Sequence, residues 1–464
     1  MIVMKFGGTS VEDARSIANA ISLVSREKER HPVVVLSAIA GATDALLKSA
    51  ELSVAEDFEQ STSILNDLLE RHVVIAENLI DSRSAVQGLI FDLRKRFEEL
   101  RNLCQSIAIL GELTKRSLDT IAAMGELMST SIFSEAMRDK RHDVAWVDAR
   151  SFMITDEQFG NATPIFGDID ARANAVIMPL LRENKIVITQ GFIGSTARKI
   201  TTTLGRGGSD YSAAIIGAAL NAEEIQIWTD VDGILTADPR ITPNAKKLRM
   251  ISYREASELA YFGAKVLHPS TLRPAVQKNI PVVVLNSKRP HSTGTRVLAS
   301  PPASNISVKS IANKRGISVV NVQATRFLTA NRFMESILSV FEKHHTPLDL
   351  INTSVASASL TIGDPENLEA IVSELEVFAD VAVFKNKAIV SIIGERLHST
   401  VGVADRIFKS LGDIDVMMIS QGASELNISL VIDDQKVNEA VIRLHHEFFE
   451  PLPIEKLFED ITTE

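Results

Sequence analysis

The chain has 464 residues, 45% of them hydrophobic and 23% charged, which excludes a disordered protein and predicts two or three domains. The formal net charge of −10 argues against binding to nucleic acid or to an anionic membrane. The single cysteine, Cys104, excludes an intrachain disulfide and a cysteine-based zinc site, and the absence of a leader-like or membrane-spanning apolar segment predicts a cytoplasmic protein.

A short apolar run at residues 1–4 predicts the first strand, and the motif KFGGTS at residues 5–10 joins it to a helical pattern. Glycines ahead of a helix let backbone N–H groups approach an anion, which the helix dipole also favours. Lys5 adds a mobile positive charge, while Thr9 and Ser10 offer hydroxyls that can cap the helix or donate to an oxygen. Taken alone, a single pair of glycines is better explained by a plain strand–turn–helix with a surface lysine.

Alternating strands and helices continue to about residue 290 and predict a large α/β domain with a mainly parallel sheet. Short apolar runs mark the strands, at residues 33–38, 144–147, 185–193, 224–229 and 281–286. Helical patterns lie between them, at residues 12–30, 56–140, 170–184 and 209–221. Neither a P-loop motif nor a GxGxxG fingerprint after a strand is present, so both of those nucleotide-binding folds are excluded.

A second glycine-rich helix entry, LGRGGSD, occurs at residues 204–210. Its Arg206 offers a planar fork for a carboxylate or phosphate, and its Asp210 could hold an ammonium group or Mg²⁺. The simpler interpretation of Asp210 is a first-turn acid that interacts with the helix dipole. Two separate helix entries, each with a cation, predict a polyphosphate or two anionic ligands.

Two further segments place charged groups near the expected C-terminal edge of the sheet, where open α/β sheets bind ligands. The first is WTDVDGI at 228–234 with DPR at 238–240; a solvated turn explains its Gly and Pro but leaves its Asp and Arg density unexplained. The second is FGAKVLHP at 262–269, whose lysine lies in an apolar frame and either reaches solvent or points at an anion.

Residues 288–305 are rich in Pro, Ser, Gly and Asn and predict a seam between domains. Beyond this seam, a strand–helix–strand–strand–helix pattern occurs twice, over residues 316–377 and 388–449. Each copy is typical of a small α+β module of the ferredoxin-like kind.

Taken together, the motifs resemble the aspartokinase family, whose members use ATP to phosphorylate the β-carboxylate of aspartate. The likeness covers essentially the whole chain, and its wording is most similar to the monofunctional, lysine-sensitive branch. The segments that carry it are KFGGTS, GELMS at 125–129, TQGFIG at 189–194, TTTLGRGGSDYSAA at 201–214, WTDVDGI, DPR and FGAKVLHP.

The resemblance implies a domain plan, which begins with a three-layer amino-acid-kinase domain at residues 1–295 and a seam at 296–312. Two ferredoxin-like ACT domains would follow at 313–385 and 386–464, with the C-terminal segment able to complete the first. The family also implies ATP and Mg²⁺ as cofactors, L-aspartate as substrate, and a homodimer or higher homo-oligomer formed through the ACT domains. The resemblance further implies that the reaction would be the first step of the pathway to lysine, threonine and methionine, and to diaminopimelate.

The matching positions imply a set of site residues. The substrate would be bound by Thr43, Glu126, Arg206 and Asp210. ATP would be bound by Lys5, Gly7, Gly8, Thr229, Asp230, Leu235, Arg240, Lys265 and Val266. Catalysis falls to Lys5, Lys265 and Asp210, and no side chain is assigned to a metal. Leu235 stands where the family often has an adenine-facing tyrosine.

This chemistry needs no general base, because a carboxylate with a pKa of about 3.9 is already ionised at neutral pH. The task is to align two anions and to neutralise the phosphoryl group in transfer. We therefore expect Lys5 and Lys265, together with Mg²⁺, to stabilise the transition state.

The family's effector site matches Phe333, Met334, Asp349, Thr353 and Ser354, and Asp349 is the natural partner of an amino group. The simpler interpretation is that Asp349 only ends a turn. Departures from the lysine-sensitive pattern occur at Ala330, Pro347 and Val355. L-lysine is therefore the expected effector, with threonine left open.

Three alternatives compete with this interpretation. A sister kinase acting on glutamate, N-acetylglutamate, carbamate or UMP should lack the tandem repeat and the FGAKVLHP segment. A fusion with homoserine dehydrogenase is disfavoured because no dinucleotide fingerprint occurs before Glu464. A non-catalytic amino-acid sensor should have lost Lys5, Arg206 or Asp210, and all three are present.

Overall fold

A computed structural model describes residues 1–263, 272–302, 306–325, 330–363, 367–422, 424–450 and 458–460. It divides into two compact units. The first comprises residues 1–234, 249–253 and 266–301, and the second comprises 235–248, 254–265 and 302–464. Among the helices in these described ranges, none is long and apolar enough to cross a membrane.

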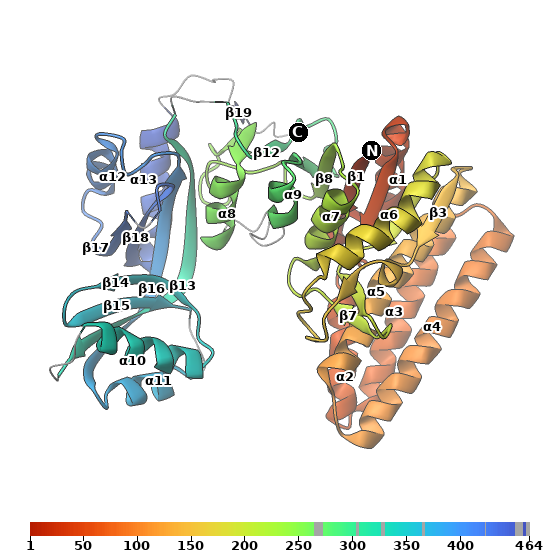
Figure 1. Cartoon of the computed structure of the whole chain (residues 1–464), viewed down its shortest axis with the longest axis horizontal. Helices are drawn as coiled ribbons and strands as arrows, with labels where there is room; N and C mark the ends of the chain where they lie inside the picture. The colour runs from red at the N-terminus through yellow and green to blue at the C-terminus, as the bar shows by residue number, and fades with distance from the viewer. Residues whose placement is uncertain are drawn as a thin grey trace. The chain divides into compact units, whose positions relative to one another are not determined.

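The first unit is built on an eight-stranded sheet in the order β10-β12-β11-β8-β1-β2-β5-β3. Figure 1 labels its strands β12, β8, β1 and β3. Neighbours are parallel except for the antiparallel pair β11 and β12. The strands are β1 (Ile2–Phe6), β2 (Pro32–Leu36), β3 (Val144–Val147), β5 (Ile186–Gln190), β8 (Glu224–Thr229), β10 (Met250–Ser252), β11 (Val282–Asn286) and β12 (Thr295–Leu298). Every residue of β1, β2 and β5 is buried, which explains their continuous apolar sequence and confirms the predicted sheet.

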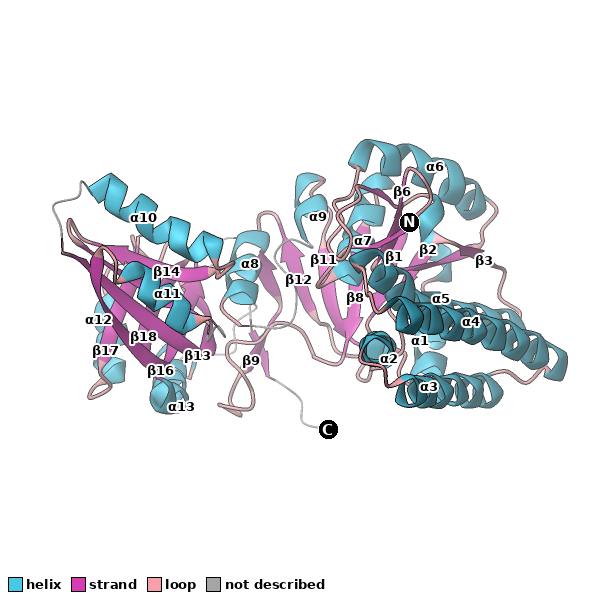
Figure 2. Cartoon of the chain, turned by 90° about the horizontal axis from the view of Figure 1, so that it is seen from below, coloured by secondary structure: helices cyan, strands magenta, loops and turns pink. Residues whose placement is uncertain are grey.

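Helices cover both faces of this sheet and produce the three-layer architecture (Figure 2). One layer contains α1 (Ala14–Arg26), α2 (Ala42–Val54), α3 (Phe58–Leu79), α4 (Arg83–Leu110) and α5 (Lys115–Asp139). The other contains α6 (Phe166–Arg182), α7 (Gly208–Ala219) and the short α9 (Arg273–Gln277). A small sheet in the order β4-β6-β7 is added by β4 (Ile154–Thr155), β6 (Ile193–Thr196) and β7 (Thr201–Thr203).

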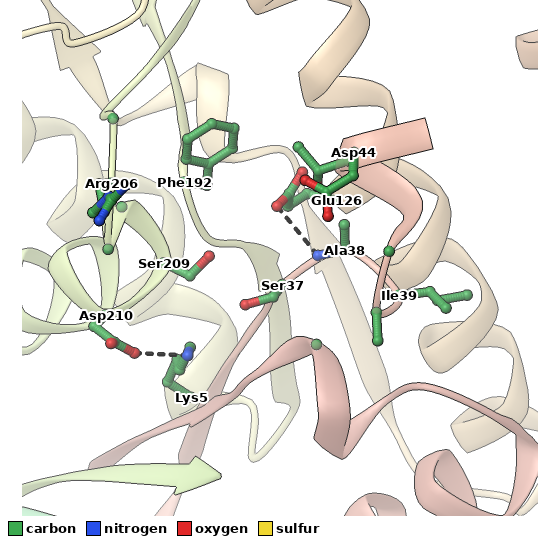
Figure 3. Close-up of a pocket in the computed structure, with 17 residues that line it drawn as sticks. Lys5, Ser37, Ala38, Ile39, Asp44, Glu126, Phe192, Arg206, Ser209 and Asp210 are labelled. Atoms are coloured by element: carbon green, nitrogen blue, oxygen red, sulfur yellow. Dashed lines mark hydrogen bonds and ion pairs between the residues drawn. The ribbon is translucent and has the colours of Figure 1, made fainter. Parts of the chain in front are cut away.

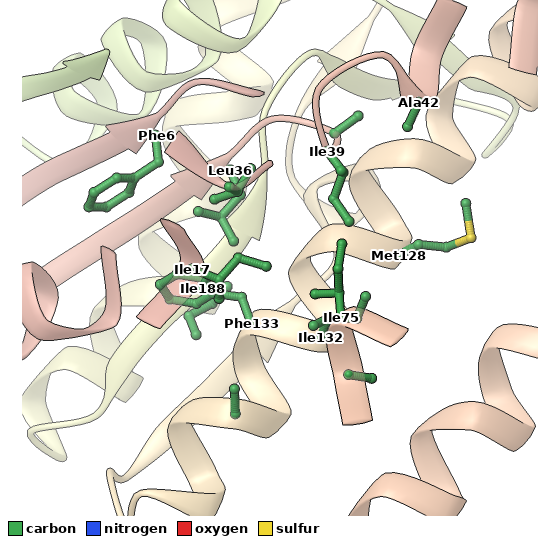
Figure 4. Close-up of a cluster of buried hydrophobic side chains, with 14 of the residues drawn as sticks. Phe6, Ile17, Leu36, Ile39, Ala42, Ile75, Met128, Ile132, Phe133 and Ile188 are labelled. Carbon is green, nitrogen blue, oxygen red and sulfur yellow. The ribbon is translucent and has the colours of Figure 1, made fainter. Parts of the chain in front are cut away.

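The core of the first unit lies between the sheet and the layer α1–α5 (Figure 4). Phe6 of β1 and Leu36 of β2 point into it and meet Ile17 of α1 and Phe133 of α5. Because side chains alternate along a strand, Lys5 points to the opposite face of the sheet, where α7 packs. The pleat therefore places this lysine among the groups of α7.

The segment after β1 is a 3-10 turn, Gly8–Ser10, and α1 starts only at Ala14. The carboxylate of Asp13 caps α1 by accepting a hydrogen bond from the backbone N–H of Ser16 at 2.7 Å. Ser10 is therefore not the cap of α1, and its predicted contact with an oxygen of a bound anion stays a prediction. Its buried hydroxyl donates to the carbonyl of Trp228 at 3.3 Å and lies 2.8 Å from the hydroxyl of Ser287.

The second unit contains a six-stranded antiparallel sheet in the order β14-β15-β13-β16-β18-β17. Its strands are β13 (Val308–Ala324), β14 (Leu348–Thr353), β15 (Ser357–Ile362), β16 (Ala379–Gly394), β17 (Val416–Gln421) and β18 (Asn427–Asp433). The helices are α10 (Ala330–Lys343), α11 (Leu368–Leu375), α12 (Val403–Leu411) and α13 (Val437–Phe449). This order confirms the doubled strand–helix–strand–strand–helix pattern.

The two central strands, β13 and β16, are longer than the sequence pattern predicted. Residues 319–324 of β13 pair with 379–384 of β16, and residues 308–314 pair with 389–394. Each long strand therefore serves both α+β modules, and the start of β13 adds an extra strand beside the second module. The two modules share one sheet rather than following each other as separate domains.

Three elements from earlier in the chain or from its end complete the second unit. Strand β9 (Lys246–Leu248) pairs with β19 (Phe458–Asp460). Helix α8 (Tyr253–Tyr261) is attached to the six-stranded sheet: Glu258 accepts hydrogen bonds from Ser424 and Asn427, and the Tyr261 hydroxyl donates to the carbonyl of Leu348 at 3.2 Å. The segment just before FGAKVLHP is thus held by the ACT-like sheet.

Candidate functional site

A cleft of about 560 Å³ opens in the first unit at the C-terminal ends of β1 and β2. Ligands of open parallel sheets bind at this edge. Its walls come from the ends of both strands, the start of α2, the middle of α5 and the loop that leads into α7 (Figure 3). The lining residues are Lys5, Gly8, Ser37, Ala38, Ile39, Ala40, Gly41, Thr43, Asp44, Glu126, Phe192, Gly205, Arg206, Gly207, Gly208, Ser209 and Asp210.

Lys5 and Asp210 form an ion pair at one end of this cleft. The Nζ atom of Lys5 lies 2.7 Å from Oδ1 of Asp210, in contact but without the angle of a hydrogen bond. Both side chains are largely shielded from solvent, with exposures of 10% and 17%. Asp210 lies in the first turn of α7, whose N-cap is Gly207 with φ 72°. The two glycine-rich motifs, about 200 residues apart in sequence, are thereby joined by opposite charges.

Glu126 of α5 lies at the other end of the cleft and is almost fully buried. Its Oε1 accepts a hydrogen bond from the backbone N–H of Ala38 at 3.2 Å, and Oε2 has no hydrogen-bond partner among the described residues. Burial raises the pKa of Glu126 to about 8. Glu126 lines the cleft, and its ionised form, with one oxygen unpartnered among the described residues, is suited to a cationic ligand group such as an ammonium.

Arg206 is an exposed residue on the loop that enters α7, and its guanidinium makes no ion pair with the described residues. The flanking glycines at 205 and 207 both have positive φ, at 74° and 72°, so this tight loop depends on their freedom. Among the described residues, one cleft thus contains both the Arg206 guanidinium, which has no ion-pair partner, and the Glu126 side chain, which has no cationic partner. Figure 3 shows the Ser37 and Ser209 hydroxyls between Glu126 and the Lys5–Asp210 pair in this view.

Most of the other residues predicted for the catalytic domain lie in the first unit. Thr43 and Gly8 line the cleft, and a Cβ atom on Gly8 would lie only 3.1 Å from the carbonyl oxygen of Ala38. Gly7 does not line it, and its N–H donates to the carbonyl of Trp228 at 3.1 Å. Thr229 and Asp230 follow at the end of β8, the neighbour of β1, with the Thr229 hydroxyl donating to Asp230 at 3.2 Å.

The remaining ATP-binding predictions lie in the second unit or outside the described residues. Leu235 and Arg240 belong to the second unit. There Arg240 is highly exposed and forms an ion pair with Asp238 at 2.7 Å, and the Leu235 carbonyl accepts a hydrogen bond from Ser310 at 2.8 Å. Lys265 and Val266 lie outside the described residues. Their roles stay predictions.

The residues predicted for the effector site lie in the first α+β module. Asp349 of β14 is paired with Lys314 of β13, whose Nζ lies 2.6 and 2.7 Å from its two oxygens. Phe333 is buried in the module core and Met334 packs against that core. Thr353 and Ser354 are exposed at the end of β14. Asp349 thus already binds a lysine ammonium, one supplied by the chain itself.

The cleft residues that sequence reasoning did not select as site residues include Ser37, Asp44, Phe192 and Ser209. Ser37 directly follows β2 and Phe192 lies two residues after β5, and the C-terminal ends of such parallel strands meet at one edge of the sheet. Both residues lay inside runs predicted as strand, 33–38 and 185–193, so the sequence pattern did not place either of them after a strand end. Asp44 and Ser209 sit beside Thr43 and Asp210, which the resemblance had already selected.

Comparison with known proteins gives a consistent result. Residues 1–286 match the Amino acid kinase family, and residues 390–448 match an ACT domain. The chain is 36% identical to the lysine-sensitive aspartokinase 3 of Escherichia coli over 470 residues, covering 97% of this chain and 99% of that protein. It resembles the crystal structure of E. coli aspartokinase III with aspartate and ADP (R-state), with TM-score 0.83, 34% identity and coverage of 97% and 100%. The structure of that enzyme with lysine and aspartate (T-state) gives TM-score 0.82, 35% identity and coverage of 97% and 99%.

Proposed function

The chain belongs to the aspartokinase family and is an ATP-dependent aspartate kinase, and we propose that the cleft around Lys5, Glu126 and Arg206 is where it acts. The reaction transfers the γ-phosphoryl group of ATP to the β-carboxylate of L-aspartate. The observation that carries the proposal is that Glu126, which lines the cleft, has a buried Oε2 with no hydrogen-bond partner among the described residues. An α-ammonium group supplies the missing partner, and Arg206 supplies a fork for a carboxylate of the same molecule.

Lys5 acts at the opposite end of the cleft. Its ammonium, held by Asp210 in the structure, is placed to meet the phosphoryl oxygens as negative charge develops on them. Asp210 keeps this lysine oriented, and the N-terminus of α7 adds partial positive charge. Since the β-carboxylate of aspartate is already ionised, these residues orient and neutralise rather than remove a proton.

Mg²⁺ is proposed to arrive with ATP rather than in a protein cage. No cluster of three or more potential ligands among His, Cys, Asp and Glu occurs in the described part of the chain. This donor set fits a nucleotide-borne Mg²⁺, which is bound mainly through substrate phosphates and water. When bound, the ion neutralises phosphate charge, and the protein's contribution remains that of Lys5 and the helix terminus.

The direct test is an assay of purified full-length protein with ATP, Mg²⁺ and aspartate, in which hydroxylamine traps the acyl phosphate as a hydroxamate. We expect hydroxamate that depends on both substrates and none with D-aspartate. Equal or greater rates with glutamate, N-acetylglutamate or carbamate would point instead to a sister kinase. The absence of hydroxamate under every condition would refute the assignment.

Regulation is proposed to involve L-lysine bound at the ACT-like modules of a homodimer or larger homo-oligomer. The E. coli relative is named lysine-sensitive, and its structure has been determined with lysine. In this chain Asp349 already accepts an ammonium from Lys314, so its carboxylate suits the same group of an effector. Helix α8, held by Glu258 to the six-stranded sheet, offers a covalent route from the regulatory sheet towards the FGAKVLHP segment.

Asp349→Asn is expected to weaken inhibition by lysine by about tenfold or more, because a charged hydrogen-bond acceptor for the effector amine is lost. The uninhibited kcat should stay unchanged. Inhibition curves with lysine and with threonine measure the effect. Asp380→Asn removes an exposed carboxylate of β16 and serves as the matched control, with an unaltered curve. If threonine but not lysine inhibits the wild type, the effector is threonine and the proposal of lysine is wrong.

A further inference from the structure

Asp119 is a buried carboxylate that the mechanism above does not use. It lies in the second turn of α5, is 2% exposed and does not line the cleft. The backbone N–H of Gly160 donates to both of its oxygens at 3.0 Å. Thr203 donates twice more, from its backbone N–H to Oδ2 at 3.0 Å and from its hydroxyl to Oδ1 at 2.7 Å. Since the backbone N–H partners can only donate, a carboxylate is the natural acceptor here.

These hydrogen bonds hold both sides of the loop that carries Arg206. Thr203 is the last residue of β7 and leads directly into Leu204 and the loop. Gly160 belongs to the turn against which the loop rests: a Cβ atom on Gly205 would overlap the side chain of Asn161. One carboxylate therefore anchors the loop at its base and fixes the turn that supports it.

Helix α5 also carries Glu126, seven residues after Asp119. Seven residues are two turns, so the two carboxylates lie on about the same face of the helix, roughly 10 Å apart along its axis. Glu126 faces the cleft directly, while Asp119 acts on Arg206 through Thr203. The positions of Glu126 and Arg206, the two residues proposed to bind the substrate's charged groups, therefore both depend on helix α5. Gly125 seats this helix tightly, because a Cβ atom there would lie 2.8 Å from Cβ of Ala38.

We propose that Asp119 is a positioning residue that sets the spacing between Arg206 and Glu126 and thereby favours aspartate over the longer glutamate. The inference rests on the proposed function of the cleft. Glu126 and Arg206 then hold the ammonium and one carboxylate of the substrate at fixed positions. The other carboxylate of the substrate reaches the phosphoryl group only if the side chain of the substrate has one particular length. If the Arg206 loop is loosened, the acceptor carboxylate of aspartate is misplaced and aspartate reacts less well. Glutamate, which has one more methylene, is then discriminated against less strongly.

The test compares Thr203→Val, which deletes only the hydroxyl donor, with Thr203→Ser, which keeps it. We expect Thr203→Val to raise the KM for aspartate about fivefold and Asp119→Asn to raise it tenfold or more, roughly as for hydrogen bonds to a charged group. The KM for ATP should stay within about twofold, and the ratio of kcat/KM for aspartate over glutamate should fall about tenfold in Asp119→Asn. Thr203→Ser should match the wild type.

A purely structural role for Asp119 would change the KM values for ATP and aspartate together or lower only the melting temperature, and either result overturns the inference. So does an unaltered aspartate-to-glutamate ratio in folded Asp119→Asn. If Asp119→Asn does not fold, the comparison of the KM for aspartate in Thr203→Val and Thr203→Ser tests the inference, and equal values in the two variants overturn it. The variant Arg206→Ala distinguishes a failure of the proposed substrate site from a failure of the positioning role of Asp119. A normal aspartate KM in Arg206→Ala refutes the proposed site, whereas a raised KM there with normal Thr203→Val and Asp119→Asn refutes only the positioning role.

Discussion

Replacing Lys5 with methionine is expected to lower kcat about 10³-fold while changing the KM for aspartate by less than about threefold. Methionine keeps an unbranched apolar side chain of similar length, so the buried stem of Lys5 is replaced without a cavity. What is lost is the ammonium that neutralises the phosphoryl group in transfer. Steady-state kinetics with saturating ATP and Mg²⁺, with aspartate varied, measures both constants.

The Lys5–Asp210 ion pair requires a control for stability. Lys5→Met leaves Asp210 shielded from solvent without its cation, which destabilises the fold independently of catalysis. The double variant Lys5→Met/Asp210→Asn removes this unpaired charge. Its melting temperature should return towards the wild-type value, whereas kcat should remain low. Recovery of kcat together with stability would show that Lys5 has only a structural role, as would near-normal turnover in a folded single variant.

The catalytic fold was largely predictable because its strands are buried on both faces. Continuous apolar runs such as 33–38 and 224–229 became β2 and β8, almost residue for residue. The meeting of Lys5 with Asp210 was less accessible. Sequence indicated two anion cradles, but their pairing depends on α7 packing against the face of β1 to which Lys5 points. That relation follows from the sheet order, which no local pattern contains.

The regulatory sheet illustrates a different limit. The first half of β13, residues 308–314, mixes polar and apolar residues directly after a Pro- and Ser-rich seam, so no strand was predicted there. It forms because β16 offers a partner from a distant part of the chain. The ion pair of Asp349 with Lys314 depends on the same long strand. Non-local pairing, rather than propensity, determined both features.

The sequence resemblance selected Glu126 for its position, whereas the structure gives the physical reason. An acid at residue 126 of a helical sequence is unremarkable by itself, since solvent usually satisfies it. Here burial leaves Oε1 with the N–H of Ala38 and Oε2 with no partner among the described side chains. The resulting demand for a cation could not be read from the pattern.

Glu126→Gln is accordingly expected to raise the KM for aspartate about 10²-fold, since it removes one partner of a buried, hydrogen-bonded charge pair. The amide can still accept from the N–H of Ala38, so the local fold should be retained. It presents an NH₂ group or a neutral oxygen to the substrate ammonium in place of a charge. Glu135→Gln changes a glutamate of the same helix outside the cleft and is the matched control, with an unaltered KM. An unchanged KM in Glu126→Gln would contradict the proposed contact.

The pH dependence of the wild type tests the same contact without a mutation. The pKa of Glu126 in the unliganded cleft is about 8, so at lower pH the side chain is mainly protonated. The substrate ammonium requires the carboxylate form, and binding therefore releases a proton. Consequently the KM for aspartate should fall by up to about tenfold for each unit as pH rises towards 8, then level off, and Glu126→Gln should abolish the slope.

Stability should change in the opposite sense over this range. The pKa of Glu126 is raised from 4.5 to about 8, so the folded, unliganded protein holds a proton that the unfolded chain releases. This group's contribution to the free energy of unfolding is therefore full below pH 4.5 and is lost as pH rises towards 8. Glu126→Gln should be less sensitive to pH in thermal melts over that interval, and saturating aspartate should restore stability to the wild type most strongly near pH 8. Loss of the proton from Glu126 as pH rises thus lowers the stability of the unliganded protein and raises its affinity for aspartate.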